Sequence, residues 1–133
     1  MSKSIVACLE DLFFRSKIDA TARHLDLPVR FVDAAGLVEA CSEPGTAAAL
    51  VELNDGALEA VRRMRQKKET RAVAVIGFLS HVDKALAQLA EEAGVTTVLP
   101  RSQFSENLPE LLMDLMAPGT HREVQEEPEL PDE

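Results

Sequence analysis

The stretch AAALVELND, residues 47–55, decides the fold that we expect for this chain. A run of apolar residues leads directly to an acid, Glu52, and the turn-forming residues Asn54, Asp55 and Gly56 follow at once. A continuous apolar run of this length is typical of a parallel strand that is buried on both faces. Because functional groups in open α/β sheets lie at the carboxyl ends of such strands, we expect Glu52 to mark the functional site.

Short apolar runs of this kind alternate with amphipathic segments along the chain. We expect strands at residues 4–9, 29–32, 48–53, 71–78 and 96–99, and helices at residues 12–25, 35–42, 57–66 and 82–93 and from 105 onward. Alternating strands and helices require parallel strands joined by right-handed crossovers, with helices on both faces. The sequence therefore predicts an α/β fold, a three-layer doubly wound sheet of five parallel strands in the order 2-1-3-4-5. A truncated nucleotide-binding arrangement is the other order considered.

Local signals set the expected helix ends. Asn54 or Asp55 is expected to cap the helix at 57–66. The segment Ser80 to Asp83 has the spacing of a capping box, which predicts a helix that opens at residue 82. Ser105 is expected to start one last helix through Leu108, Leu112 and Met116.

The charge of the chain is concentrated at its end. The net charge is −9, of which −5 lies in residues 121–133 and −4 in residues 1–120. We expect one folded domain at 1–117 and an acidic, disordered tail at 118–133, because the tail has almost nothing apolar to bury. The body carries no overall basic footprint for nucleic acid.

Two cysteines and the start of the chain bear on location. Cys8 and Cys41 lie in apolar contexts without metal-type spacing, which suits a reducing cytosol. The N-terminus becomes acidic too soon for a signal peptide, and no apolar run approaches the ~20 residues of a membrane span. The expectation is a cytoplasmic protein with no membrane contact.

Polar side chains follow three of the expected strands. Glu10 and Asp11 follow the first, Glu52 ends the third and Arg101 follows the fifth. In the order 2-1-3-4-5 the first and third strands are neighbours, so three carboxylates crowd one edge. Either Arg101 or a hard cation such as Mg²⁺ would relieve their repulsion, and an Arg101–Glu52 salt bridge is the favoured form. Glu10 and Asp11 can also serve simply as acids at a helix N-terminus.

These residues, in this order, resemble the receiver domain of the response-regulator (CheY-like) family, over residues 4–116. The resemblance implies that Glu10 and Asp11 occupy the positions of the metal-binding acids, with weak Mg²⁺ binding as a hypothesis. It implies that Glu52 stands at the phosphoacceptor position and Arg101 at the position of the family's lysine. No other cofactor is expected.

The resemblance also implies a switch region after the fourth strand, at Gly77, Leu79 and Ser80. The family has a hydroxyl residue there, and in this chain Ser80 arrives at least one residue late. Ser80 is more simply a helix cap, and His81 an exposed residue at a helix start.

The departures from the family pattern set the expected function. An aspartyl carboxylate attacks phosphorus as a nucleophile, and the extra methylene of Glu52 displaces the carboxylate by about a bond length. Arginine at position 101 changes the reach and geometry of the cation. The sequence therefore predicts a non-enzymatic pseudo-receiver that signals through protein contacts without stable phosphorylation.

The resemblance further implies a partner or homodimer face on the last helix and the fifth strand. Leu12, Phe13 and Phe14 form a wider apolar patch than one helix face needs. The basic run at residues 62–68 is interpreted as a solvated helix face, with a phosphate-rich partner or the acidic tail as alternatives.

A second function class stays open, a flavodoxin-like domain that binds a small molecule or cofactor and has an enzymatic role. The segment LEDLFF after the first strand is acidic and bulky, so it does not cradle phosphate. Residues 77–81 and 100–103 could still line an anion pocket.

Overall fold

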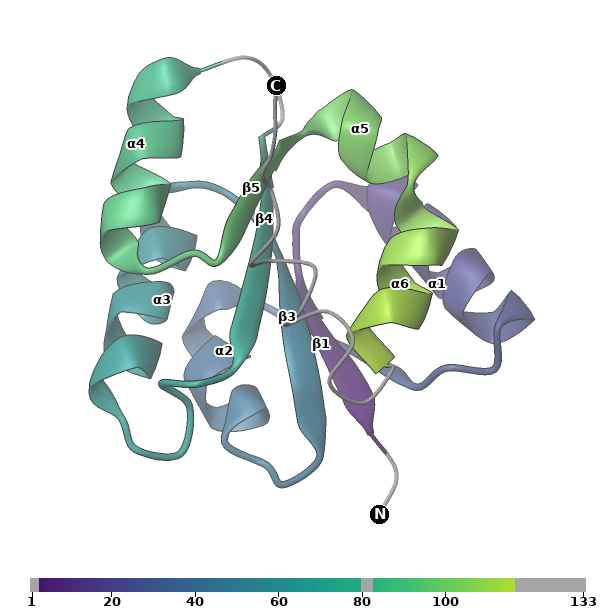
Figure 1. The fold of residues 1–133 in the computed structure, drawn as a ribbon, viewed down its shortest axis with the longest axis horizontal. Coiled ribbons are helices and arrows are strands. Elements are labelled where there is room, and N and C mark those ends of the chain that lie inside the picture. The colour runs from purple at the N-terminus through teal and green to yellow at the C-terminus, as the bar shows by residue number, and fades with distance from the viewer. Residues whose placement is uncertain (1–2, 80–82, 117–133) are drawn as a thin grey trace.

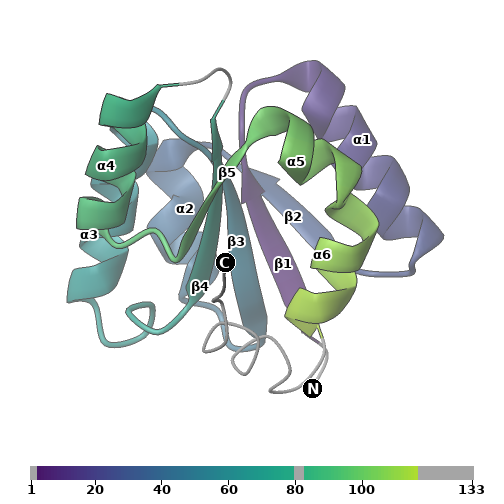
Figure 2. The ribbon, with the colours of Figure 1, turned by 45° about the horizontal axis from the view of Figure 1, so that its top comes forward.

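The computed structural model describes residues 3–79 and 83–116, which form a parallel sheet between two layers of helices (Figures 1 and 2). The strands are β1 Ser4–Cys8, β2 Val29–Val32, β3 Thr46–Glu52, β4 Ala74–Leu79 and β5 Thr97–Pro100. The helices are α1 Leu12–His24, α2 Ala34–Cys41, α3 Asp55–Gln66, α4 Lys84–Ala93, α5 Arg101–Glu106 and α6 Leu108–Met116. The sheet order is β2-β1-β3-β4-β5, so the predicted fold class is confirmed. The predictions for Ser80, His81 and residues 118–133 lie outside the described residues.

The three central strands are apolar at nearly every position because both of their faces are covered. Alternate residues of a strand point to opposite faces. Leu50 therefore packs in the core beneath α1, α5 and α6, while Val51 packs in the core beneath α2, α3 and α4. Figure 2 shows these two helical layers on either side of the sheet.

Four helices begin by the same device. A side-chain oxygen of Asp11, Asp33, Asn54 or Asp83 accepts the backbone N–H three residues later at the start of α1, α2, α3 or α4. Such a cap satisfies one of the backbone donors that a helix N-terminus leaves open. The cap of α4 is therefore Asp83, and the prediction that this helix opens at residue 82 was wrong by two residues.

The last helix is divided in two, contrary to the prediction of one helix from residue 105. α5 ends at Glu106, Asn107 closes it, and α6 begins at Leu108. Pro109 explains the break, because proline has no N–H to donate within a helix and its ring clashes with the preceding turn.

The fourth strand also starts later than predicted, at Ala74 and not at residue 71. The Arg65 guanidinium explains the difference. Its Nη1 donates to the carbonyl oxygens of Arg71 at 3.0 Å and Val73 at 2.7 Å. These carbonyls therefore accept hydrogen bonds from a side chain and not from a neighbouring strand.

The register of the sheet positions the expected site. Cys8 at the end of β1 pairs with Val51 of β3, and Glu52 pairs with Phe78 of β4. The ends of these three strands consequently lie at one edge of the sheet.

Gly77 in β4 provides a test of the packing behind this edge. A Cβ at position 77 would lie 2.7 Å from Cδ2 and 3.0 Å from Cγ of Leu53, which is itself buried. We expect Gly77→Ala to lower the free energy of unfolding by about 1–3 kcal/mol, measured by urea denaturation followed by circular dichroism. Gly36→Ala is the matched control, because its Cβ would meet ordinary contacts at 3.4 Å and beyond. Equal stability of the two variants would contradict the proposed close packing.

Candidate functional site

Glu52 crosses from the end of β3 to the loop that follows β1. Its Oε1 accepts the backbone N–H of Glu10 at 2.8 Å and that of Asp11 at 3.3 Å. Hydrogen bonds to an ionised acceptor are about twice as strong as neutral ones. The carboxylate predicted to mark the site is therefore an anchor for the β1–α1 loop.

Asp11 uses its two carboxylate oxygens for different partners. Oδ1 accepts the N–H of Phe14 at 3.1 Å and caps α1, while Oδ2 lies 3.2 Å from Nη2 of Arg101. The sequence favoured Glu52 as the partner of Arg101, but the ion pair that the structure gives for Arg101 is with Asp11. Arg101 therefore lies at the site as predicted, but it pairs with Asp11 and not with Glu52.

The guanidinium of Arg101 also lies over an aromatic ring. Its Cζ is 4.5 Å from the centroid of the Phe14 ring, a cation–π geometry. Phe14 in turn belongs to a cluster with Phe78 and Phe104, in which the rings of the latter two stack at 4.4 Å. The contact with this aromatic cluster thus helps to position the Arg101 guanidinium next to Asp11.

A small acidic cavity lies on the other side of Glu52. It has a volume of about 40 Å³, and Cys8, Glu10, Asp33 and Glu52 are among its lining residues. Burial raises the pKa of the Cys8 thiol to about 11, and the negative charges of Asp33, Glu10 and Glu52 add to the rise. Cys8 is therefore a protonated core thiol at neutral pH, not a reactive one.

The acids do not fit a magnesium site of the kind that the resemblance implied. Mg²⁺ takes near-ideal octahedral oxygen coordination. Here one Asp11 oxygen caps a helix, the other faces Arg101, and Oε1 of Glu52 holds two backbone amides. Within residues 3–79 and 83–116, no group of three or more potential metal ligands is found. Arg101 supplies the positive charge next to Asp11.

The expected switch region is only partly described. Gly77 packs against Leu53 and Leu79 ends β4 as a buried residue, while Ser80 lies outside the described residues. The roles implied for these three residues stay predictions.

One further residue shapes the site without having been singled out from the sequence. Asp33 follows β2, caps α2 by accepting the N–H of Gly36 at 2.9 Å, and lines the acidic cavity. Its position directly between an expected strand and an expected helix was the available signal. The pocket beside Arg101 includes Leu79 and residues 100–102, which lie in the two segments that the sequence suggested for an anion pocket. The part of its wall that comes from α1 had no such signal.

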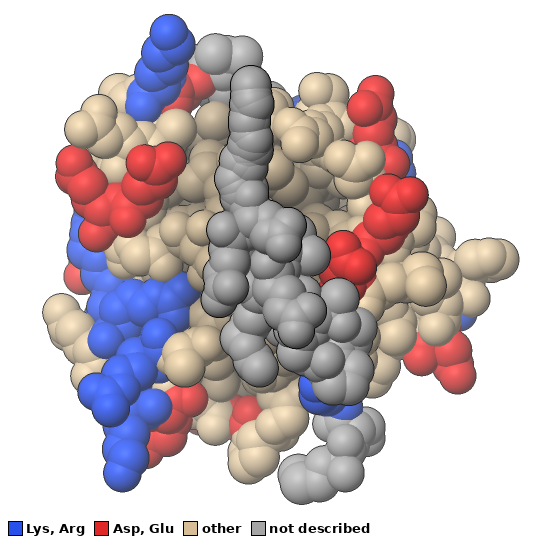
Figure 3. Space-filling model, viewed as in Figure 1, with Lys and Arg blue, Asp and Glu red and all other residues tan. Residues whose placement is uncertain are grey.

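The basic run at residues 62–68 is not one solvated face. Arg65 Nε donates to the carbonyl of Gly94 at 2.9 Å, in addition to its contacts at Arg71 and Val73. That interpretation was therefore wrong for Arg65, which ties α3 to the loop before β4 and to the end of α4 before β5. Figure 3 shows Lys and Arg side chains gathered on the side where Figure 1 draws α3.

Comparison with solved structures identifies this arrangement as the fold of response-regulator receiver domains. The receiver domain of a Pseudomonas aeruginosa sensor histidine kinase, which holds magnesium in its active-site cleft, is similar with a TM-score of 0.73 and 18% identity over 87% of this chain and 98% of that one. A Hahella chejuensis response regulator matches with a TM-score of 0.76 and 14% identity over 88% and 97%. The phosphorylated cyanobacterial phytochrome response regulator RcpA matches with 0.73 and 11% over 90% and 98%.

Sequence comparisons add no relative. No protein-family model matches the chain, and no curated protein matches it. In the described part of the chain, no helix is long and apolar enough to cross a membrane.

Shortening the Glu52 side chain tests the anchor. We expect Glu52→Asp to speed hydrogen exchange of the Glu10 and Asp11 amides by about tenfold, because the shorter carboxylate no longer reaches them. Glu52→Gln keeps the length of the side chain and one acceptor oxygen. The exchange rates of the two amides in this variant should therefore lie between those of the wild type and those of Glu52→Asp. Glu39→Asp on the exposed surface of α2 is the matched control and should leave both amides unchanged. Unaltered exchange in Glu52→Asp would show that the carboxylate does not hold this loop.

Proposed function

We propose that this chain is a receiver-fold signalling module that acts through protein contacts and does not take part in phosphoryl transfer. The supporting observation is the contact of Glu52 Oε1 with two backbone N–H groups, at 2.8 and 3.3 Å. A nucleophilic carboxylate oxygen must face the phosphorus atom in line with the leaving group. The observed contact aims this oxygen at the protein's own backbone.

The Arg101–Asp11 ion pair supports the same proposal. In this arrangement a fixed guanidinium, and not a diffusible ion, balances the acids after β1. We propose that the module has no cofactor and that weak Mg²⁺ binding by Glu10 and Asp11 has no role in its function. The proposal that the module is not an enzyme is supported by the contact of Glu52 Oε1 with two backbone N–H groups.

The proposed contact face consists of α6 and β5, and a homodimer is its simplest use. Met113 on α6 is 56% exposed, and β5 is the last strand of the described sheet. Nucleic acid is not the proposed partner, because Arg65 of the basic run donates to backbone carbonyls inside the fold. Two free buried cysteines support a cytoplasmic location.

Phosphorylation chemistry tests the central proposal. After incubation with acetyl phosphate and Mg²⁺, we expect intact mass spectrometry to show no added phosphoryl group. An NMR titration with Mg²⁺ alone should leave the amide signals of Asp11 and Glu52 unchanged. A phosphoryl gain that disappears in Glu52→Ala would overturn the proposal, and a saturable shift at Asp11 would overturn its metal-free part.

Sedimentation velocity over a series of protein concentrations tests the contact face. If α6 forms the dimer, Met113→Lys should weaken association by at least about tenfold, because a charge replaces an apolar contact. Leu12→Lys, at an even more exposed apolar position on α1, is the control and should associate as the wild type does. The reverse pattern would place the interface on α1.

A further inference from the structure

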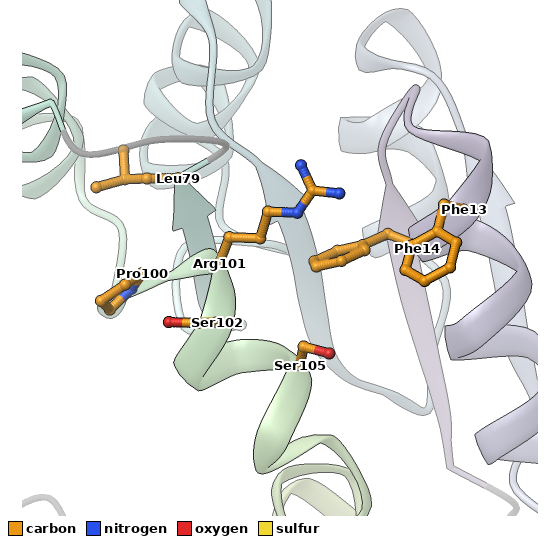
Figure 4. A pocket seen from close by; sticks show the side chains of 7 residues that line it. All are labelled: Phe13, Phe14, Leu79, Pro100, Arg101, Ser102 and Ser105. Carbon is orange, nitrogen blue, oxygen red and sulfur yellow. The ribbon is translucent and has the colours of Figure 1, made fainter.

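A pocket of about 540 Å³ lies beside Arg101, between α1 and α5 (Figure 4). This volume falls within the range of pockets that hold small organic ligands, roughly 300–1,000 Å³. Phe13 and Phe14 line it from α1, and Leu79 and Pro100 line it from the ends of β4 and β5. Its walls are thus largely apolar and include two aromatic rings.

Polar groups are few and come from one side. Arg101, Ser102 and Ser105 line the pocket from α5, and the guanidinium of Arg101 extends toward the Phe14 ring in Figure 4. Lys17 Nζ donates to Ser105 Oγ, so a second cation lies next to the pocket wall. Apolar walls with a few convergent polar groups are typical of a small-molecule site.

The guanidinium has donors to spare for a ligand. Arginine carries five N–H donors in a planar fork, and Asp11 accounts for one contact, at Nη2. The side chain of Arg101 is 41% exposed, so the fork is reachable from solvent. A planar carboxylate is the group that such a fork matches best.

We propose that this pocket binds a small organic carboxylate with an aromatic body, whose ring lies against Phe13 and whose carboxylate pairs with Arg101. The ligand is a monoanion, because the Asp11 carboxylate already balances one of the two cations, Arg101 and Lys17, that lie at the pocket. The site goes beyond the contact function proposed above and does not depend on whether Glu52 is phosphorylated.

Binding at this pocket is coupled to the anchored site. The ligand carboxylate and Asp11 share one guanidinium, so an occupied pocket weakens the Arg101–Asp11 ion pair. Asp11 also caps α1, and its backbone N–H donates to Glu52 Oε1. A ligand can therefore shift the start of α1, which gives the module an input that requires no phosphoryl group.

Naphthalene-2-carboxylate and its neutral analogue naphthalene-2-carboxamide are the probes that test this site. The chain contains no Trp or Tyr, so naphthalene fluorescence is measured without interference from the protein. We expect the carboxylate to bind at least about tenfold more tightly than the carboxamide, as a charge-assisted pair with arginine requires. The carboxylate should also shift the NMR signals of Phe13, Ser102 and Asp11.

Three variants separate the parts of the proposal. Arg101→Gln should reduce carboxylate affinity to that of the carboxamide, and Phe13→Ala should weaken both probes by a similar factor. Leu89→Ala removes an exposed apolar side chain from α4 and is the matched control, with no expected change. Circular dichroism spectra like that of the wild type establish that each variant is folded.

Several outcomes would overturn the proposal. Equal affinities for the two probes, or unchanged binding in Arg101→Gln, would remove the anion site. Unchanged binding in Phe13→Ala, or shifts confined to residues away from α1 and α5, would place the probe elsewhere. Self-association that Phe13→Ala abolishes would assign the pocket to a second copy of the chain.

Discussion

The hydrogen bonds from Glu52 to the backbone of Glu10 and Asp11 are the contact on which the arrangement of the site depends. They join the end of β3 to the loop between β1 and α1. Asp11 then caps α1 with one oxygen and meets Arg101 with the other. Because Arg101 begins α5 and lies over Phe14, a continuous set of contacts runs from the centre of the sheet to the helices that cover one face.

The length of the Glu52 side chain, one methylene more than that of aspartate, makes this anchor possible. An aspartate at position 52 ends about one bond length earlier, so its carboxylate would stop short of the neighbouring loop. The longer side chain brings the negative charge to the backbone N–H groups of Glu10 and Asp11. The proposal that Glu52 does not accept a phosphoryl group and the observed contact with the β1–α1 loop thus concern the same side chain. The pocket beside Arg101 is the site proposed to give such a module its input.

Arg65 shows how one side chain sets the limits of several elements. Its guanidinium takes carbonyls at Arg71, Val73 and Gly94, so the residues before β4 turn and do not extend. In the sequence, Arg65 is one of several basic residues on a helix that we expected to be exposed. A run of charged residues does not indicate which of its side chains points toward the protein. The break at Asn107 differs, since the prediction of one helix from residue 105 overlooked a signal that was visible in the sequence. Pro109 has no N–H to donate within a helix.

The sequence by itself determined the order of strands and helices, the parallel sheet and the position of Glu52 at its carboxyl edge. This was possible because the spacing of apolar residues and the acids that follow a strand can be identified from short stretches of sequence. Only the tertiary structure decided that Arg101 pairs with Asp11, and that Phe13, Pro100 and Ser105 enclose a pocket. These residues are far apart along the chain, and their distances depend on helix packing against the sheet. Local pattern carries no information about that packing, because several side chains of similar length can reach the same edge.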